Sequence, residues 1–204
     1  MSAAVMVMQT LPLLIQAMTN PVEVTNYSTA LRLFSLALNV MGIIIIPYWS
    51  SFTDAYTQKD FVWMQKSVAK LQKFFIYLLF FQLVILILSP GIYYFWVNHW
   101  VQENSNILNI PFLMSSAVCL YTTAVCWQNI CIYPINGIGK VKLQMYSSIV
   151  EMLLFIPVAL WMGHHWKASG IILAPVIISI PRMIWAPIQI NKLIKNKAVG
   201  IWNK

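Results

Sequence analysis

The chain has 204 residues, of which 60% are hydrophobic and only 9% charged, and its mean hydropathy is +0.72. A soluble domain has about 45–50% apolar and about 25% charged residues, so the composition excludes a soluble globular protein. The formal net charge of +8 does not indicate a nucleic-acid partner, because most lysines lie in short loops between apolar runs. The composition predicts an integral membrane protein surrounded by membrane lipids.

Six apolar runs follow one another, at about residues 3–19, 27–49, 74–97, 107–133, 143–163 and 168–190. A membrane-spanning helix needs about 20 apolar residues, so the last five runs qualify and the first is marginal. Each span must close its own backbone hydrogen bonds, which favours helices. We therefore expect an all-α integral membrane protein, a bundle of about six transmembrane helices in a single domain over residues 1–204.

The loops alternate between basic and nearly uncharged. Ten lysines lie in loops 53–73 and 134–142 and in the tail 191–204, whereas loops 20–26, 98–106 and 164–167 together hold one, Lys167. The positive-inside rule places the basic loops and the basic C-terminal tail in the cytoplasm. Four tryptophans then fall at the outer boundary, as in an aromatic belt: Trp96, Trp100, Trp161 and Trp166.

Residues 57–73 form a basic amphipathic segment. Thr57 and Asp60 are spaced like the start of a capping box, and at about 100° per residue one face is apolar. That face holds Phe61, Met64, Val68, Leu71 and Phe75, and the opposite face holds Lys59, Lys66, Lys70 and Lys73. The pattern predicts a separate helix lying in the plane of the cytoplasmic membrane surface, with its lysines near anionic headgroups. A solvated linker helix is the alternative.

Two residue types that often mark special sites have ordinary explanations here. Cys119, Cys126 and Cys131 lie in one apolar run without metal-ligand spacing, so we interpret them as small buried residues and expect no metal or cofactor. Pro175 and Pro181 interrupt the last run. Prolines kink a helix, and such kinks are either static or allow a transport helix to bend.

Three strongly ionisable side chains lie inside the spans: Arg32, Glu151 and Arg182. A charge there is costly and almost always faces a partner, a cavity or a substrate. Glu151 and Arg182 each lie eight residues from the cytoplasmic end of neighbouring antiparallel spans, so an ion pair is expected between them, either structural or lining a polar cavity. Arg32 is about 7–8 Å below the outer boundary, where it either binds substrate or snorkels to the surface.

The chain resembles a known transporter family in several short motifs. Residues 27–33 read YSTALRL at the start of a span, and residues 47–56 read PYWSSFTDAY before the basic segment. Residues 136–142 read NGIGKVK, and residues 167–174 read KASGIILA at the start of the last span. In order and spacing these resemble the polysaccharide (O-antigen type) flippases of the multidrug/oligosaccharidyl-lipid/polysaccharide exporter superfamily.

The resemblance implies a two-lobe inverted-V transporter of the bacterial cell inner membrane, of which this chain looks like the C-terminal lobe. An N-terminal lobe would then be its partner. Its substrate would be an undecaprenyl-pyrophosphate-linked glycan, the repeat unit of O-antigen or lipopolysaccharide biosynthesis. Arg32 matches the family's arginine in the first full span of this lobe and would bind the pyrophosphate. Arg182 and Glu151 match no family motif and are candidate substrate-binding residues by depth alone.

Three other functions compete with a flippase. A cation-coupled multidrug exporter would need cavity carboxylates, and only Glu151 is available inside the spans. A membrane-embedded enzyme would need a convergent acid–base set, and no such motif is present, so no enzymatic activity is expected. A non-transporting membrane subunit or an inactive fragment is the remaining alternative.

Overall fold

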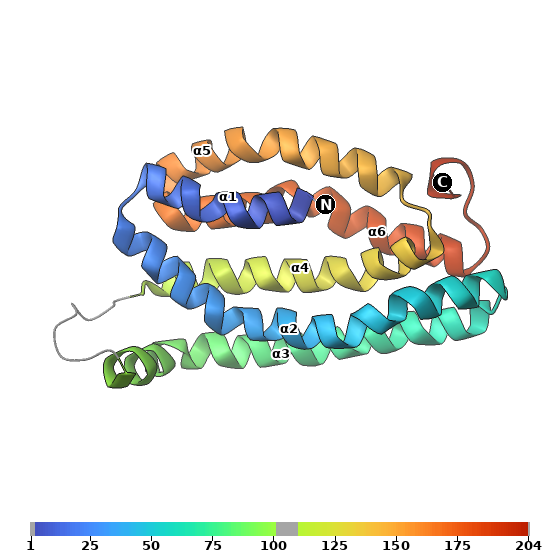
Figure 1. Cartoon of the computed structure of the whole chain (residues 1–204), viewed down its shortest axis with the longest axis horizontal. Coiled ribbons are helices and arrows are strands. Elements are labelled where there is room, and N and C mark those ends of the chain that lie inside the picture. Colours follow the sequence, from blue (N-terminus) through green and yellow to red (C-terminus); the bar gives the residue numbers. More distant parts are fainter. Residues whose placement is uncertain (1–2, 101–109, 204) are drawn as a thin grey trace.

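The structure is a computed structural model that describes residues 3–100 and 110–203, except for the side chains of residues 3–6, 8 and 97–100. It is all-α and 91% helical, as the sequence predicts. Long helices lie side by side along one axis (Figure 1). They are α1 (Ala3–Met18), α2 (Pro21–Thr57), α3 (Phe61–Trp100), α4 (Phe112–Ile138), α5 (Lys142–Ile178) and α6 (Ile180–Ile194), followed by a short 3-10 helix, η1 (Gly200–Asn203).

Each apolar run of the sequence coincides with helix, although the helices α2 and α3 are much longer than the runs predicted for them. Three stretches of the described chain are long and apolar enough to cross a membrane: Pro21–Thr57, Phe61–Trp96 and Lys142–Ile194. Helix α1 has 16 residues and is therefore about 24 Å long, which keeps it marginal. The predicted start of the fourth run, residues 107–109, lies outside the described residues.

Helix α4 is the centre of the bundle, in contact with α2, α3, α5 and α6. Sixteen of its 27 residues are buried, although it is not among the three described stretches that are long and apolar enough to cross a membrane. Its three cysteines are free and buried, as predicted. Polar side chains fasten it to α3, since Gln82 Nε2 donates to Thr122 Oγ1 at 2.7 Å and Thr123 Oγ1 donates to Gln82 Oε1 at 2.6 Å.

The stretch Lys142–Ile194 folds back on itself inside α5. Trp166 and Lys167 leave helical geometry, and Lys167 has φ 50° and ψ −139°. The returning arm passes so close that a Cβ on Gly170 would lie 2.2 Å from the carbonyl oxygen of Met162. The runs 143–163 and 168–190 are therefore two antiparallel arms joined by a tight turn, as their spacing in the sequence predicts.

The segment predicted as an amphipathic helix near residues 57–73 is helical from Phe61 onward, but it is the first part of α3 and not a separate in-plane helix. Helix α2 continues to Thr57, and after a short turn Asp60 Oδ1 accepts the N–H of Trp63 at 2.9 Å, which caps the start of the 40-residue α3. The apolar face of the segment is buried within the protein, where Met64, Val68 and Leu71 pack against α2 and α6. That face is unavailable to a membrane surface because protein already covers it.

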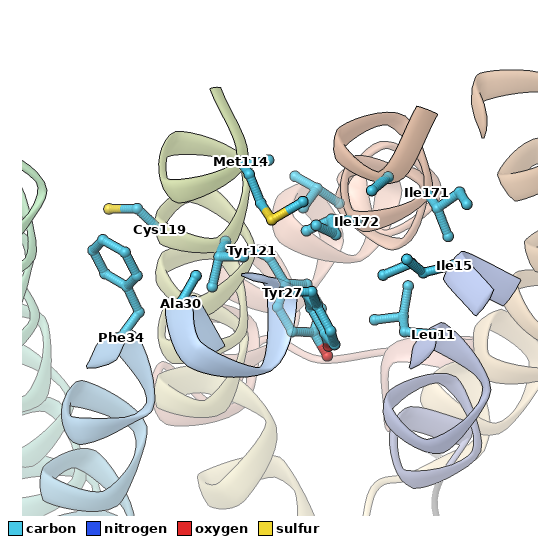
Figure 2. Close-up of a cluster of buried hydrophobic side chains, with 14 of the residues drawn as sticks. Leu11, Ile15, Tyr27, Ala30, Phe34, Met114, Cys119, Tyr121, Ile171 and Ile172 are labelled. Atoms are coloured by element: carbon cyan, nitrogen blue, oxygen red, sulfur yellow. The ribbon is translucent and has the colours of Figure 1, made fainter. Parts of the chain in front are cut away.

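The core divides into two apolar clusters along the bundle. One gathers residues of all five helices α1 to α5, including Leu11, Phe34, Met114 and Ile171 (Figure 2). Tyr27 and Tyr121 lie close together inside it. The other gathers residues of α2, α3, α4 and α6 and extends from Ala37 to the α2–α3 turn. The C-terminal tail packs against α6, since Lys192 Nζ lies 4.2 Å from the ring centre of Trp202.

Candidate functional site

The two arms of Lys142–Ile194 meet in a buried ion pair between Glu151 and Arg182. Arg182 Nε donates to Glu151 Oε1 at 2.9 Å, and Arg182 Nη2 also lies against Glu151 Oε2. The same Nη2 donates to Ser148 Oγ at 2.9 Å. The relative exposures of the two charged side chains are 10% for Arg182 and 18% for Glu151. The predicted pairing is therefore confirmed, and Ser148 is a third member that the sequence analysis missed.

The turn at Lys167 explains why these residues meet. Glu151 and Arg182 lie 16 and 15 residues from it (167 − 151 and 182 − 167), so antiparallel arms bring them to one level. Arg182 belongs to the first turn of α6, where the helix dipole disfavours a cation. The carboxylate of Glu151 offsets that unfavourable position. The pair thus stabilises a break between α5 and α6 that a cation alone would weaken.

A second polar contact holds the break itself. Ser179 ends α5 and precedes α6. Its Oγ accepts a hydrogen bond from Gln128 Nε2 of α4 at 2.9 Å and donates to the carbonyl oxygen of Val176 at 3.0 Å. Pro181, which has no N–H, follows two residues later, so regular helical bonding cannot continue here. Pro175 and Pro181, which were predicted to kink the last run, therefore flank the break between α5 and α6. The hydrogen bond from Gln128 connects this break to α4.

A small pocket lies beside these groups and is lined by Gln128, Glu151, Ser179 and Arg182, with Tyr121 and apolar side chains of α1, α4 and α5. Its cavity volume is about 60 Å³. Drug-sized ligands occupy pockets of about 300–1,000 Å³, whereas a few water molecules fit in this space. The pocket alone is too small to hold a glycan.

Arg32 lies elsewhere and in a different setting. It is exposed on α2, and within the described residues its guanidinium has no hydrogen-bond or ion-pair partner. It does not line the pocket beside Glu151 and Arg182. Of the three candidate site residues, the structure therefore brings together Glu151 and Arg182 but not Arg32.

The exposed face of α2 around Arg32 carries several polar side chains. Thr25, Ser28, Thr29, Ser35 and Asn39 all fall within about 60° of Arg32 on a helical projection. The aliphatic side chains of Leu36 and Ile43, which are 48% and 76% exposed, lie within the same 60°. Thr29 and Ser35 donate to backbone carbonyls of their own helix, which satisfies their hydroxyls. Asn39 is exposed, and its side chain has no polar partner in the described part of the chain.

The corresponding face of α3 is entirely different. Beyond Lys73, its large exposed side chains are a mixture of aromatic and aliphatic ones, among them Ile76, Tyr77, Phe80, Phe81, Leu83, Val84, Ile87 and Leu88. None of them carries a charge or an amide. Such a surface suits the hydrocarbon of a bilayer, whereas the side chains of Arg32 and Asn39 on α2 do not. The sequence analysis missed Asn39, although its seven-residue spacing from Arg32 was a signal that could have revealed it.

The comparisons with known proteins return nothing for this chain: no family model, no curated protein and no solved structure matches it. Among the side chains that the structure describes, no group of His, Cys, Asp or Glu is arranged to hold a metal ion. Any function must therefore be argued from the α2 face and from the Glu151–Arg182 site.

Proposed function

We propose that this protein exports a lipid-linked oligosaccharide across the bacterial inner membrane, as a lobe of a flippase of the polysaccharide type. In this proposal six helical spans form one lobe, and the basic loops and the C-terminus are cytoplasmic. A second lobe stands opposite α2. Rocking of the two lobes exposes the cleft between them to each side of the membrane in turn.

The observation that carries the proposal is the unpartnered Arg32 on the polar outer half of α2. In a bilayer this arginine would lie about 7–8 Å below the outer boundary, with Asn39 about another 10 Å deeper. An unpaired charge costs about 2.5–3.5 kcal/mol or more at the centre of a span, and less near its ends. A water-filled cleft removes that cost and leaves the guanidinium free to bind an anion.

The chemistry of the cargo fits such a face. A polyprenyl diphosphate sugar has an anionic diphosphate, a neutral glycan that forms many hydrogen bonds, and an apolar tail. Arg32 presents a planar set of N–H donors suited to phosphate oxygens. The polar face of α2 would hold the head group, while the tail stays in lipid beside apolar surfaces such as that of α3.

Arg182 and Glu151 enter the proposal as part of the polar wall behind the cleft. Because they neutralise each other, and because their pocket is small, Arg32 rather than Arg182 is the cation assigned to the diphosphate. The same neutralisation argues against a cation-coupled exporter, since the carboxylate inside the spans is already engaged by an arginine.

The test is restoration of surface polysaccharide in a strain that lacks its own flippase. The full open reading frame that contains this sequence is expressed in three forms: wild type, Arg32→Ala and Lys195→Ala. The amount of each protein in the membrane is matched. Lys195 is an exposed cation beyond α6 and serves as the charge control. We expect the wild type and Lys195→Ala to restore the polysaccharide and Arg32→Ala to fail. Equal activity of Arg32→Ala would refute the proposal.

A further inference from the structure

Asn39 occupies the most demanding position on the exposed face of α2. It lies ten residues from Trp49, the predicted cytoplasmic boundary, and therefore about 15 Å deep. That is about the centre of a hydrocarbon layer roughly 30 Å thick. Its amide is exposed and lacks a polar partner among the described residues. An unsatisfied amide in an apolar medium costs several kcal/mol, so in a membrane this position is favourable only against water or another polar group.

The spacing between Asn39 and Arg32 matches the size of a ligand head group. Seven residues separate them, which is about two helical turns, so both side chains leave the same face about 10 Å apart. If Arg32 binds the diphosphate, a group attached directly to that diphosphate and extending toward the cytoplasm reaches Asn39. This step rests on the proposed function.

The chemistry of an asparagine side chain selects what that attached group is. Its amide offers two N–H donors and a carbonyl acceptor without a charge. Hydroxyl and acetamido groups of a sugar ring pair with both kinds of atom, whereas a prenyl chain pairs with neither. We propose that Asn39 contacts the first sugar of the lipid-linked glycan, the one bonded to the diphosphate, and sets the affinity for it.

The first experiment tests whether Asn39 faces water. Asn39→Cys is labelled in membranes with a charged, membrane-impermeant thiol reagent. Val84→Cys is the matched control, because Val84 is exposed on α3 at a similar depth, about 16 Å from Lys73. The native cysteines are buried and give a low background. We expect labelling of Asn39→Cys at least tenfold faster than that of Val84→Cys, and equal rates would overturn the inference.

The second experiment tests the sugar contact. Affinities of the purified protein are measured for polyprenyl diphosphate and for the same lipid bearing one N-acetylhexosamine. We expect Asn39→Leu, which keeps the number of heavy atoms and the branching at Cγ but has no polar group, to weaken binding of the sugar-bearing lipid by about three- to tenfold, the loss of one or two hydrogen bonds. Binding of the bare lipid should not change. Arg32→Ala should weaken both.

The outcomes separate this inference from the proposal beneath it. If the wild type binds neither lipid, the flippase proposal fails and the sugar contact with it. If Arg32→Ala weakens both lipids but Asn39→Leu does not discriminate between them, the flippase proposal stands and the role of Asn39 is refuted. Partial recovery of the sugar preference in Asn39→Gln would support an amide contact over a purely steric one.

Discussion

The two arginines inside the predicted spans stand in opposite surroundings. Arg182 is buried at the break between α5 and α6, where Glu151 and Ser148 take up its hydrogen bonds. Arg32 is exposed on α2, and no side chain within the described residues forms an ion pair with it. The charge of Arg182 is neutralised by a side chain of the same bundle, whereas a counter-charge for Arg32 must be supplied by another molecule or by solvent ions.

This contrast separates a residue that holds the structure together from one available for binding. A buried pair fixes two helix arms relative to each other, and removing one partner leaves a charge without compensation. An exposed, unpaired cation contributes little to folding and can be removed with little structural consequence. Stability measurements and transport measurements should therefore respond to different arginines.

The largest expected effect is on the buried pair. Glu151→Gln leaves the Arg182 guanidinium buried without a counter-charge, which should lower the free energy of unfolding by about 3–5 kcal/mol. Thermal unfolding in detergent would measure the loss. The double variant Glu151→Leu/Arg182→Met, which removes both charges and keeps apolar volume, should recover most of it. A double variant no more stable than Glu151→Gln would contradict the pairing argument.

The next effect extends the comparison to the exposed apolar surface of α3. An arginine at Val84 would enter hydrocarbon and should disfavour membrane insertion by about 2.5–3.5 kcal/mol. An arginine at Asn39, at a similar depth on α2, should be tolerated because that face is hydrated in our proposal. The fraction of folded protein in membranes, compared between Val84→Arg and Asn39→Arg, measures the difference. Equal losses would show that both faces meet lipid.

The sequence predicted the positions of the helices and the Glu151–Arg182 pair because both depend on linear spacing. Apolar runs define where helices form, and equal distances from the turn at Lys167 place the two charges at one level. The tight packing at that turn depends on Gly170, whose lack of a side chain lets the returning arm approach Met162.

Prediction from the sequence was wrong where a helix face is covered by another part of the protein, because the sequence does not show what covers that face. The apolar stripe of residues 57–73 is compatible with a membrane surface or with a protein neighbour, and periodicity does not distinguish these. In the structure, Met64 and Leu71 are covered by protein, and the segment simply extends α3. Asn39 was missed because a single amide in an apolar run indicates a possible binding residue only when its side chain is known to be exposed, and the sequence does not show that exposure.

A smaller effect tests the third member of the buried site. Ser148→Ala removes one hydrogen bond to the Arg182 guanidinium and leaves the two contacts with Glu151 in place. Hydrogen bonds to charged groups contribute about 1.5–3 kcal/mol, and we expect a loss near the lower end because Glu151 remains. Denaturant unfolding would measure it. Ser147→Ala is the matched control, since the Ser147 hydroxyl donates only to the carbonyl oxygen of Gln144.

The smallest expected effect on stability is at Arg32, and this variant tests the contrast between Arg32 and Arg182 most directly. Because its side chain has no partner in residues 3–100 and 110–203, Arg32→Gln should change the free energy of unfolding by no more than about 0.5 kcal/mol. The same variant should lose transport, since glutamine keeps hydrogen-bonding capacity but not the charge that binds a diphosphate. Polysaccharide export is measured in the cells that express each variant, and thermal unfolding is measured on the protein purified from the same cells. A destabilised Arg32→Gln would mean that the arginine supports the fold, and the distinction between the two arginines would disappear.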